Sequence, residues 1–120
     1  MFSPRQSAIR RARRQSILYN LITSALRQKS IDDPSLAPLV ITRVELSPSG
    51  GMIHIFCTHP DGKAGYEKIR PQLVLYRPSL RTAIAQELQG HMTPHIRFQF
   101  DAQRVKQERI EALLDRVKNS

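Results

Sequence analysis

Residues 75–88, LYRPSLRTAIAQEL, constrain the fold most, because a proline interrupts an apolar pattern that has helical spacing. Leu73 precedes the interruption, and Leu80 and Ile84 follow it four residues apart. In the interior of a helix, proline removes a backbone donor and clashes with the preceding turn. The pattern therefore predicts two helices that meet at residues 76–78.

Segments that alternate between apolar and polar residues flank this broken helix and predict β-strands. The first is 39–47, with Val40, Thr42, Val44 and Leu46 expected on one face and Ile41, Arg43 and Glu45 on the other. A Pro-Ser-Gly-Gly turn joins it to a second strand at 52–59, which predicts an antiparallel hairpin. A third strand is expected at 95–101, and its inward positions are Ile96, Phe98 and Phe100.

The N-terminal segment begins with a helix-start signal and continues as a helix that is apolar only in its second half. Ser3 can cap it, Pro4 suits the first helical position, and Gln6 can reach back to the cap. The apolar stripe comprises Leu18, Leu21, Ile22, Ala25 and Leu26. Toward the N-terminus this stripe meets Arg14 and Arg11, so the first half of the helix should project beyond the core with arginines around it.

The apolar spacing near the C-terminus predicts a short amphipathic helix that carries Val105, Ile110, Leu113, Leu114 and Val117. The order of elements is then helix, strand, strand, broken helix pair, strand, helix. Three strands with helices on one face make a small α+β sandwich. A chain of 120 residues suits one domain, here residues 1–120, with a core over about 5–101 and a C-terminal helix and tail over 102–120.

The positive charge is large and unevenly distributed. The formal net charge is +9, and residues 1–29 contain seven basic residues and no acid. Residues 63–81 add Lys63, Lys68, Arg70, Arg77 and Arg81 against Glu67 alone. One-sided charge favours a polyanionic partner such as nucleic acid. The alternatives are a generally basic protein whose arginines are only solvated, and an anionic membrane surface, which the lack of an aromatic apolar face on the first helix disfavours.

The helix break is a candidate phosphate site. If Pro78 starts the second helix, its missing N–H group costs nothing there. The N–H groups of Ser79, Leu80 and Arg81 would then be free at a helix N-terminus, which favours anions. Arg77 and Arg81 would add charge on either side. The alternative is a bend that serves packing alone.

Catalytic and metal-binding patterns are missing from the sequence. The four histidines are His54, His59, His91 and His95, and none has the spacing of a helical metal motif. The acids are scattered, and no glycine-rich phosphate loop exists, so we expect neither an enzyme nor a cofactor. The single cysteine, Cys57, excludes an internal disulfide and is expected to be buried in a strand. No apolar run approaches the roughly 20 residues of a membrane helix.

The element order, with a kink between the two middle helices, resembles a type II KH domain, although the Gly-x-x-Gly loop of KH domains is missing. The local residues resemble the ribosome-binding factor A family. That resemblance is carried by Asp33-Pro34, ITRVELS (41–47), IHIFCT (53–58), Leu80-Arg81, PHIRFQFD (94–101) and RIEALLDRV (109–117), which together span about residues 8–117. The family usually has an Ala-x-Gly kink, whereas this chain has Tyr76-Arg77-Pro78.

The resemblance implies an RNA-binding assembly factor that is not an enzyme. It would bind the free, immature small ribosomal subunit, assist maturation and end-processing of its rRNA, leave before translation, and support growth in the cold. We expect a cytoplasmic monomer. The expected RNA-contacting residues are Arg10, Arg11, Arg13, Arg14, Arg77, Arg81, Lys63, Lys68 and Arg70. Two alternatives are a general KH-like chaperone of RNA or DNA without ribosomal specificity, and an RNA hydrolase.

Overall fold

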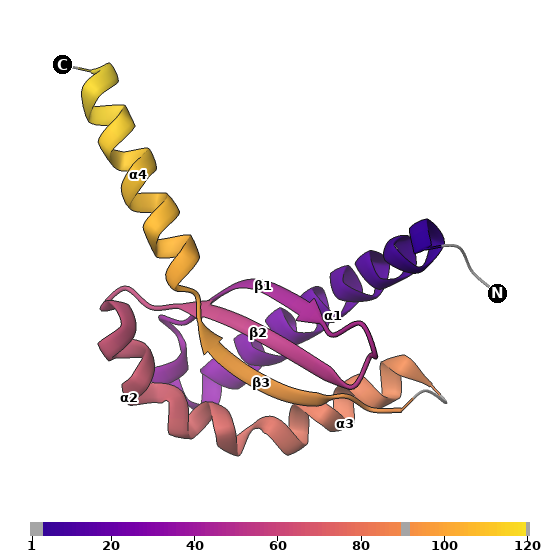
Figure 1. The fold of residues 1–120 in the computed structure, drawn as a ribbon. Coiled ribbons are helices and arrows are strands. Elements are labelled where there is room, and N and C mark those ends of the chain that lie inside the picture. The colour runs from indigo at the N-terminus through magenta and orange to yellow at the C-terminus, as the bar shows by residue number, and fades with distance from the viewer. Residues whose placement is uncertain (1–3, 90–91, 120) are drawn as a thin grey trace.

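The computed structural model describes residues 4–89 and 92–119. Its elements follow the predicted order, with a short 3₁₀ turn added after the first helix. They are α1 (Pro4–Asp32), η1 (Pro34–Leu36), β1 (Val40–Leu46), β2 (Met52–Thr58), α2 (Gly62–Leu75), α3 (Arg77–Leu88), β3 (His95–Phe100) and α4 (Ala102–Lys118). The predicted α+β class is thereby confirmed (Figure 1).

The three strands form one sheet in the order β1-β2-β3. β1 and β2 pair in antiparallel fashion, as the hairpin prediction required, and Gly50 in the connecting turn has a φ of +77° that favours glycine. β3 pairs in parallel with β2, with Ile53 opposite Ile96. The chain reaches β3 by crossing over through α2 and α3. In the order β1-β2-β3, β3 lies at an edge of the sheet, next to β2.

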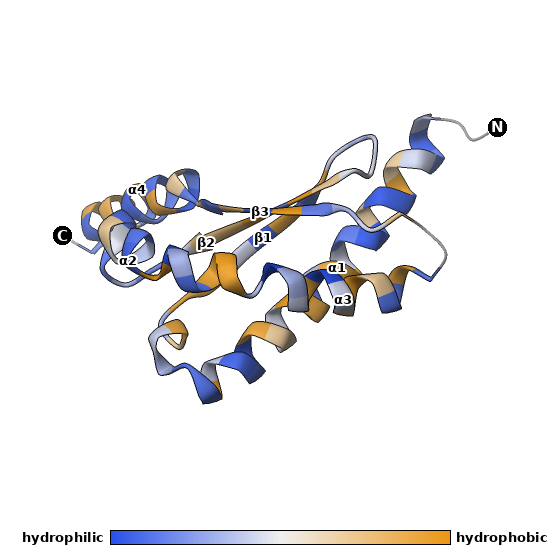
Figure 2. Cartoon of the chain, turned by 90° about the horizontal axis from the view of Figure 1, so that it is seen from below, coloured by the Kyte–Doolittle hydropathy of each residue, from blue (hydrophilic) through white to orange (hydrophobic). Residues whose placement is uncertain are grey.

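The helices α1, α2 and α3 cover one face of the sheet, and their apolar sides face it (Figure 2). The core between them contains the predicted stripe residues Leu18, Ile22 and Leu26, and Leu73, Leu80, Ile84 and Leu88 from the broken helix. Ile96 and Phe98 are buried from the strand side, and Phe100 packs against the cluster. Cys57 is fully buried, as predicted.

The predicted faces of β1 are wrong for its first half. Ile41 is buried and Val40 is 54% exposed, whereas Val44 and Leu46 are buried as expected. A β-bulge between Ile41 and Arg43 explains the difference, because one extra residue, Thr42, reverses the alternation along the strand.

The first half of α1 projects beyond the sheet, as predicted, and residues 4–13 are exposed (Figure 1). The helix begins at Pro4, and Ser3, the expected cap, lies outside the described residues. Gln15 marks the point at which α1 meets the sheet, because its side-chain oxygen accepts a hydrogen bond of 2.8 Å from the backbone N–H of Leu46.

The C-terminal helix exists as predicted, but it is longer than expected and none of its residues is buried. α4 projects away from the body of the domain, so that Ile110, Leu113, Leu114 and Val117 remain about half to three-quarters exposed (Figure 1). Asp101 holds its first turn. The carboxylate caps the helix by accepting from the Arg104 N–H and is itself only 2% exposed.

Candidate nucleic-acid interface

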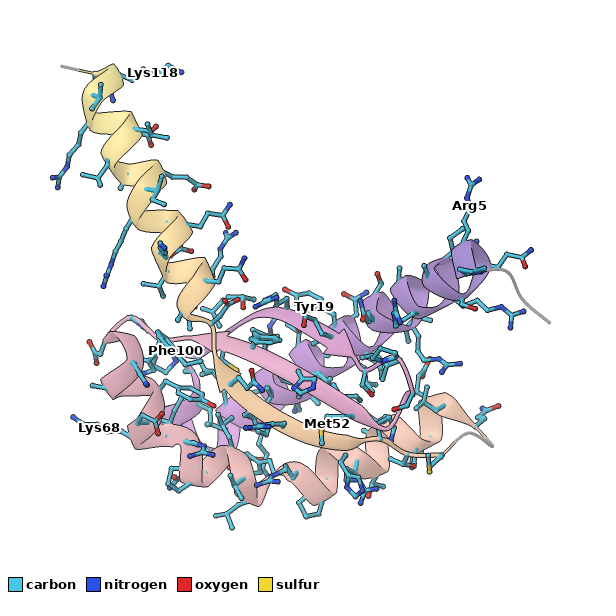
Figure 3. All side chains as sticks on the ribbon, in the orientation of Figure 1. Arg5, Tyr19, Met52, Lys68, Phe100 and Lys118 are labelled. Atoms are coloured by element: carbon cyan, nitrogen blue, oxygen red, sulfur yellow. The ribbon has the colours of Figure 1, made fainter. Side chains whose placement is uncertain are left out.

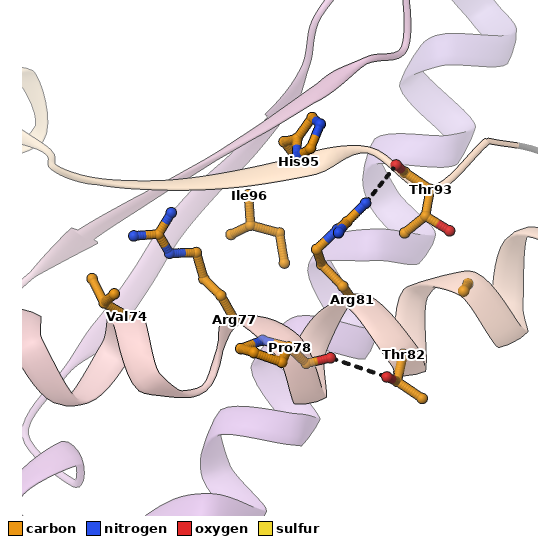
Figure 4. Close-up of a pocket in the computed structure, with 9 residues that line it drawn as sticks. Val74, Arg77, Pro78, Arg81, Thr82, Thr93, His95 and Ile96 are labelled. Atoms are coloured by element: carbon orange, nitrogen blue, oxygen red, sulfur yellow. Dashed lines mark hydrogen bonds between the residues drawn. The ribbon is translucent and has the colours of Figure 1, made fainter.

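The site begins at the junction of α2 and α3. α2 ends at Leu75, Tyr76 caps both helices, and α3 starts at Arg77 with Pro78 as its second residue. The predicted break at 76–78 is therefore confirmed. The kink turns Arg77 toward β3, where its side chain lies between Val74 and Ile96 (Figure 4).

Two adjoining hollows form a groove between this junction and the edge strand β3. They have volumes of about 620 and 280 Å³, and Val74, Arg77, His95 and Ile96 line both. We call this the β3-edge groove. Its remaining lining residues are Pro78, Arg81, Thr82, Ala85 and Thr93 in the larger hollow, and Met52, Arg70, Arg97 and Phe98 in the smaller.

The groove is lined by apolar and cationic side chains. Four arginines line it, at positions 70, 77, 81 and 97, and none of its lining residues is acidic. In the part of the chain that the structure describes, the side chains of Arg70, Arg77 and Arg97 make no hydrogen bond or ion pair. Unpaired guanidinium groups around a concave surface suit the phosphates of a nucleic acid.

Arg81 differs from the other three arginines because its guanidinium is partly engaged. It donates to the carbonyl oxygens of Pro94 and Thr93, at 3.2 Å in each case (Figure 4). These bonds tie α3 to the segment before β3. Arg81 is thus placed at the predicted site, but it has a structural role that the sequence did not indicate.

The predicted row of free N–H groups at the start of α3 is wrong for Leu80 and Arg81, two of its three members. α3 begins one residue before Pro78, so the N–H of Leu80 already donates to the carbonyl of Tyr76, at 3.0 Å. Arg81 lies one residue further into the helix, where N–H groups bond to the preceding turn. The cationic character of the groove therefore comes from its side chains.

Tyr76 connects the junction to the end of α1. Its hydroxyl donates to the Asp33 carboxylate at 3.0 Å, and the Lys29 ammonium lies 4.8 Å from the centre of its ring. Hydrogen bonds from the Ser35 and Tyr76 hydroxyls lower the pKa of Asp33. Partial burial, and then the bond to Asp33, raises the pKa of Tyr76. Asp33 therefore anchors the kink in addition to capping the 3₁₀ turn η1.

The N-terminal arginines form a second concave surface. Arg10, Arg13 and Arg14 line a hollow of about 490 Å³ with Ile17 of α1 and residues 87–89 at the end of α3. Glu87 places one acid in this hollow. The two cationic concavities thus adjoin the same helix, one along the first turns of α3 and the other at its C-terminal end.

The remaining predicted residues lie outside both concavities. Arg11 is exposed on α1, and Lys63 and Lys68 are exposed on α2. Lys68 points away from the body of the domain (Figure 3). These three side chains do not join the groups that the structure brings together.

Sequence reasoning missed two ionisable residues of the groove, His95 and Arg97. Both occupy outward positions in β3, where the alternation HIRFQF already separated them from Ile96 and Phe98. What the sequence could not reveal is that β3 lies at the sheet edge beside the kink.

The other predicted chemistry-bearing residues have local roles. His54 contacts the Gln99 amide at 3.1 Å, and His59 accepts from the N–H of Asp61 at 3.0 Å. His91 lies outside the described residues. Burial raises the pKa of the Cys57 thiol to about 12, so this cysteine is a poor nucleophile. Over residues 4–89 and 92–119, no cluster of His, Cys, Asp or Glu could hold a metal ion, and no helix is long and apolar enough to span a membrane.

Comparison with known proteins identifies the family. The family model for ribosome-binding factor A matches residues 10–114. A protein named ribosome-binding factor A from Rhodopseudomonas palustris is 29% identical over 107 residues, covering 88% of this chain and 77% of that protein. Another of the same name, from Aromatoleum aromaticum, is 25% identical over 87 residues, covering 72% of this chain and 68% of that protein.

A solved structure supports the fold independently. The crystal structure of ribosome-binding factor A from Thermus thermophilus superposes with a TM-score of 0.62 and 20% identity, over 75% of this chain and 93% of that one. Its KH-like fold is the architecture described above. With the family model covering nearly all of the folded core, the chain belongs to the ribosome-binding factor A family.

Proposed function

We propose that this protein is a ribosome assembly factor that binds the free, immature small ribosomal subunit and assists maturation and end-processing of its rRNA. The protein acts as a monomer in the cytoplasm, where subunits are assembled, and it binds RNA without cleaving it. The names of its relatives support a ribosomal partner. The observation that carries an RNA contact on this chain is the acid-free β3-edge groove with its four arginines.

The contact surface consists of the groove and the N-terminal concavity. Arg70, Arg77 and Arg97 are available to phosphates in the groove, and Arg10, Arg13 and Arg14 supply a second set at the end of α3. Because α3 adjoins both, one folded RNA segment could contact the two together. Binding at two places favours the RNA arrangement that fits both, and differential affinity of this kind shifts a folding equilibrium.

Co-sedimentation with small subunits, large subunits and whole ribosomes at several salt concentrations tests this function. We expect preferential binding to free small subunits, with a steep decrease in affinity as salt rises. Arg77→Gln should reduce the salt slope by about one phosphate contact, and simultaneous replacement of Arg10, Arg13 and Arg14 by Gln should reduce it by up to about three. Arg109→Gln, an exposed basic residue of α4 outside both concavities, is the matched control.

The outcomes separate the alternatives. Equal binding to bulk RNA of the same charge and to small subunits would indicate a general KH-like chaperone instead. Metal-dependent RNA cleavage would indicate a hydrolase. Unchanged binding after both sets of arginine replacements would remove the two concavities from the interface.

A further inference from the structure

The α2–α3 junction is held from the side opposite the groove. Arg77 points toward β3, whereas the side chain of the preceding residue, Tyr76, extends to the end of α1. There its hydroxyl donates to one carboxylate oxygen of Asp33, at 3.0 Å. The other oxygen accepts from the backbone N–H and the hydroxyl of Ser35, at 3.2 and 2.6 Å.

Both partners of Tyr76 are themselves fixed. Asp33 caps the 3₁₀ turn η1, and its own N–H donates to the carbonyl of Lys29 at 3.0 Å. The Lys29 ammonium lies over the Tyr76 ring, 4.8 Å from its centre. The tyrosine ring is therefore held at its tip and over its face by two residues of a single connected segment.

The local sequence creates a need for this restraint. A residue that precedes proline is disfavoured in helical geometry, yet Arg77 precedes Pro78 and is the first residue of α3. The backbone of Tyr76 also belongs to both helices, since its N–H bonds to the last turn of α2 and its carbonyl accepts from Leu80. A rotation at Tyr76 would therefore swing Arg77 relative to β3.

We propose that Tyr76 is a positioning residue for RNA binding: the hydrogen bond from its hydroxyl to Asp33 locks the α2–α3 junction so that Arg77 points into the β3-edge groove. This inference rests on the proposed function, because it requires Arg77 to contact RNA. It assigns to Tyr76 and Asp33 a role at a site that neither residue lines. In this chain the hydrogen bond supplies rigidity at the kink between α2 and α3.

A double-mutant cycle on the full-length protein tests the proposal, with affinity for purified small ribosomal subunits measured at several salt concentrations. Tyr76→Phe keeps the ring and its contact with Lys29 but removes the hydroxyl. We expect about 3- to 10-fold weaker binding, the equivalent of one hydrogen bond. In an Arg77→Gln background the same change should have no further effect, because the positioned group is already gone.

Tyr19→Phe is the matched control. Tyr19 is also half-buried, and its hydroxyl donates to the carbonyl of Ile41 at 3.3 Å, away from the β3-edge groove. The Tyr19→Phe variant should bind small subunits with the same affinity as the unmodified protein. Thermal unfolding of each variant separates positioning from loss of fold, since a purely structural role for Tyr76 would lower the melting temperature without coupling to Arg77.

The results distinguish this inference from the proposed function. If Arg77→Gln weakens binding and Tyr76→Phe stays within twofold of the unmodified protein, the positioning role is wrong and the RNA-binding groove stands. The positioning role would also be wrong if Tyr76→Phe weakened subunit binding equally in the unmodified protein and in the Arg77→Gln variant. If Arg77→Gln itself leaves binding unchanged, the proposed contact in the groove fails first.

Discussion

Asp101 joins the sheet to the projecting helix α4, and we predict that Asp101→Ala is strongly destabilising. The carboxylate accepts from the Thr42 hydroxyl at 2.5 Å, from Arg43 Nε at 3.2 Å and from the Arg104 N–H at 3.0 Å. Burial alone would raise the pKa of Asp101, but these hydrogen bonds and the positive charge of Arg43 outweigh it, so the pKa is lowered. The ionised form is therefore the one that the fold stabilises.

The magnitude follows from the groups that lose a partner. Loss of the helix cap costs about 1 kcal/mol. Hydrogen bonds to a charged group contribute about 1.5–3 kcal/mol each, but the Arg43 side chain is 37% exposed and water replaces much of its share. We therefore expect Asp101→Ala to reduce the free energy of unfolding by about 2–4 kcal/mol. For a chain of this size that corresponds to a decrease in Tm of roughly 8–16 °C.

Urea unfolding followed by circular dichroism measures this change, and Asp115→Ala on the exposed part of α4 is the control. Asp115 has no side-chain hydrogen bond or ion pair within the described chain, so its replacement should cost less than about 0.5 kcal/mol. If the two variants differ by less than about 1 kcal/mol, the cost of burying the Asp101 charge cancels its interactions. The reasoning from its contacts would then be refuted.

Three further predictions concern packing and pH. Gly65→Ala should cost about 1–3 kcal/mol in urea unfolding, because a Cβ atom there would overlap the imidazole ring of His59; unchanged stability would show that His59 moves freely. Ile84→Ala, at a fully buried position, should reduce the free energy of unfolding by about 2–5 kcal/mol. Leu114→Ala on exposed α4 is its control and should reduce it by less than about 0.5 kcal/mol. Equal losses would contradict the assigned core. Since the pKa of Asp101 is lowered on folding, the unfolded chain binds more protons near pH 4, and stability should be full above about pH 5 and fall as the pH decreases through that range. Asp101→Ala should flatten this acid limb, and an unaltered limb would assign it to other carboxylates.

Much of the fold could be predicted from the sequence because burial is periodic. The spacing of Leu18, Ile22 and Leu26 identified the buried side of α1, and the proline at 78 identified the junction of α2 and α3. The bulge at Thr42 was not predictable in this way, because one inserted residue changes neither composition nor apparent alternation. It depends on pairing with β2 and on the hydrogen bonds of Thr42 to Phe56 and Asp101.

The candidate site was predicted only where charge and local structure coincide. The sequence shows Arg77 at a helix break, and it shows Arg10, Arg13 and Arg14 at the polar end of a helix. The structure places all four side chains in the two concavities. His95 and Arg97 were missed because the parallel pairing that makes β3 an edge strand is a tertiary property. Which side of α2 faces the groove is likewise a tertiary property, and Lys63 and Lys68 lie outside both concavities.

The distribution of ion pairs separates arginines that have an acidic partner in the fold from those that we propose to contact RNA. Within the described residues, ion pairs join Arg43 to Glu45 and to Asp101, and Arg104 to Glu108. The Arg43–Asp101 pair joins β1 to the residue that caps α4, and each of the other two pairs lies within one element. The groove contains no acid, so bringing its arginines close together is unfavourable until a polyanion enters. Arg81 ties α3 to the segment before β3, but within the described residues the side chains of Arg70, Arg77 and Arg97 have no such partner. This unneutralised charge supports the proposed contact with a polyanion.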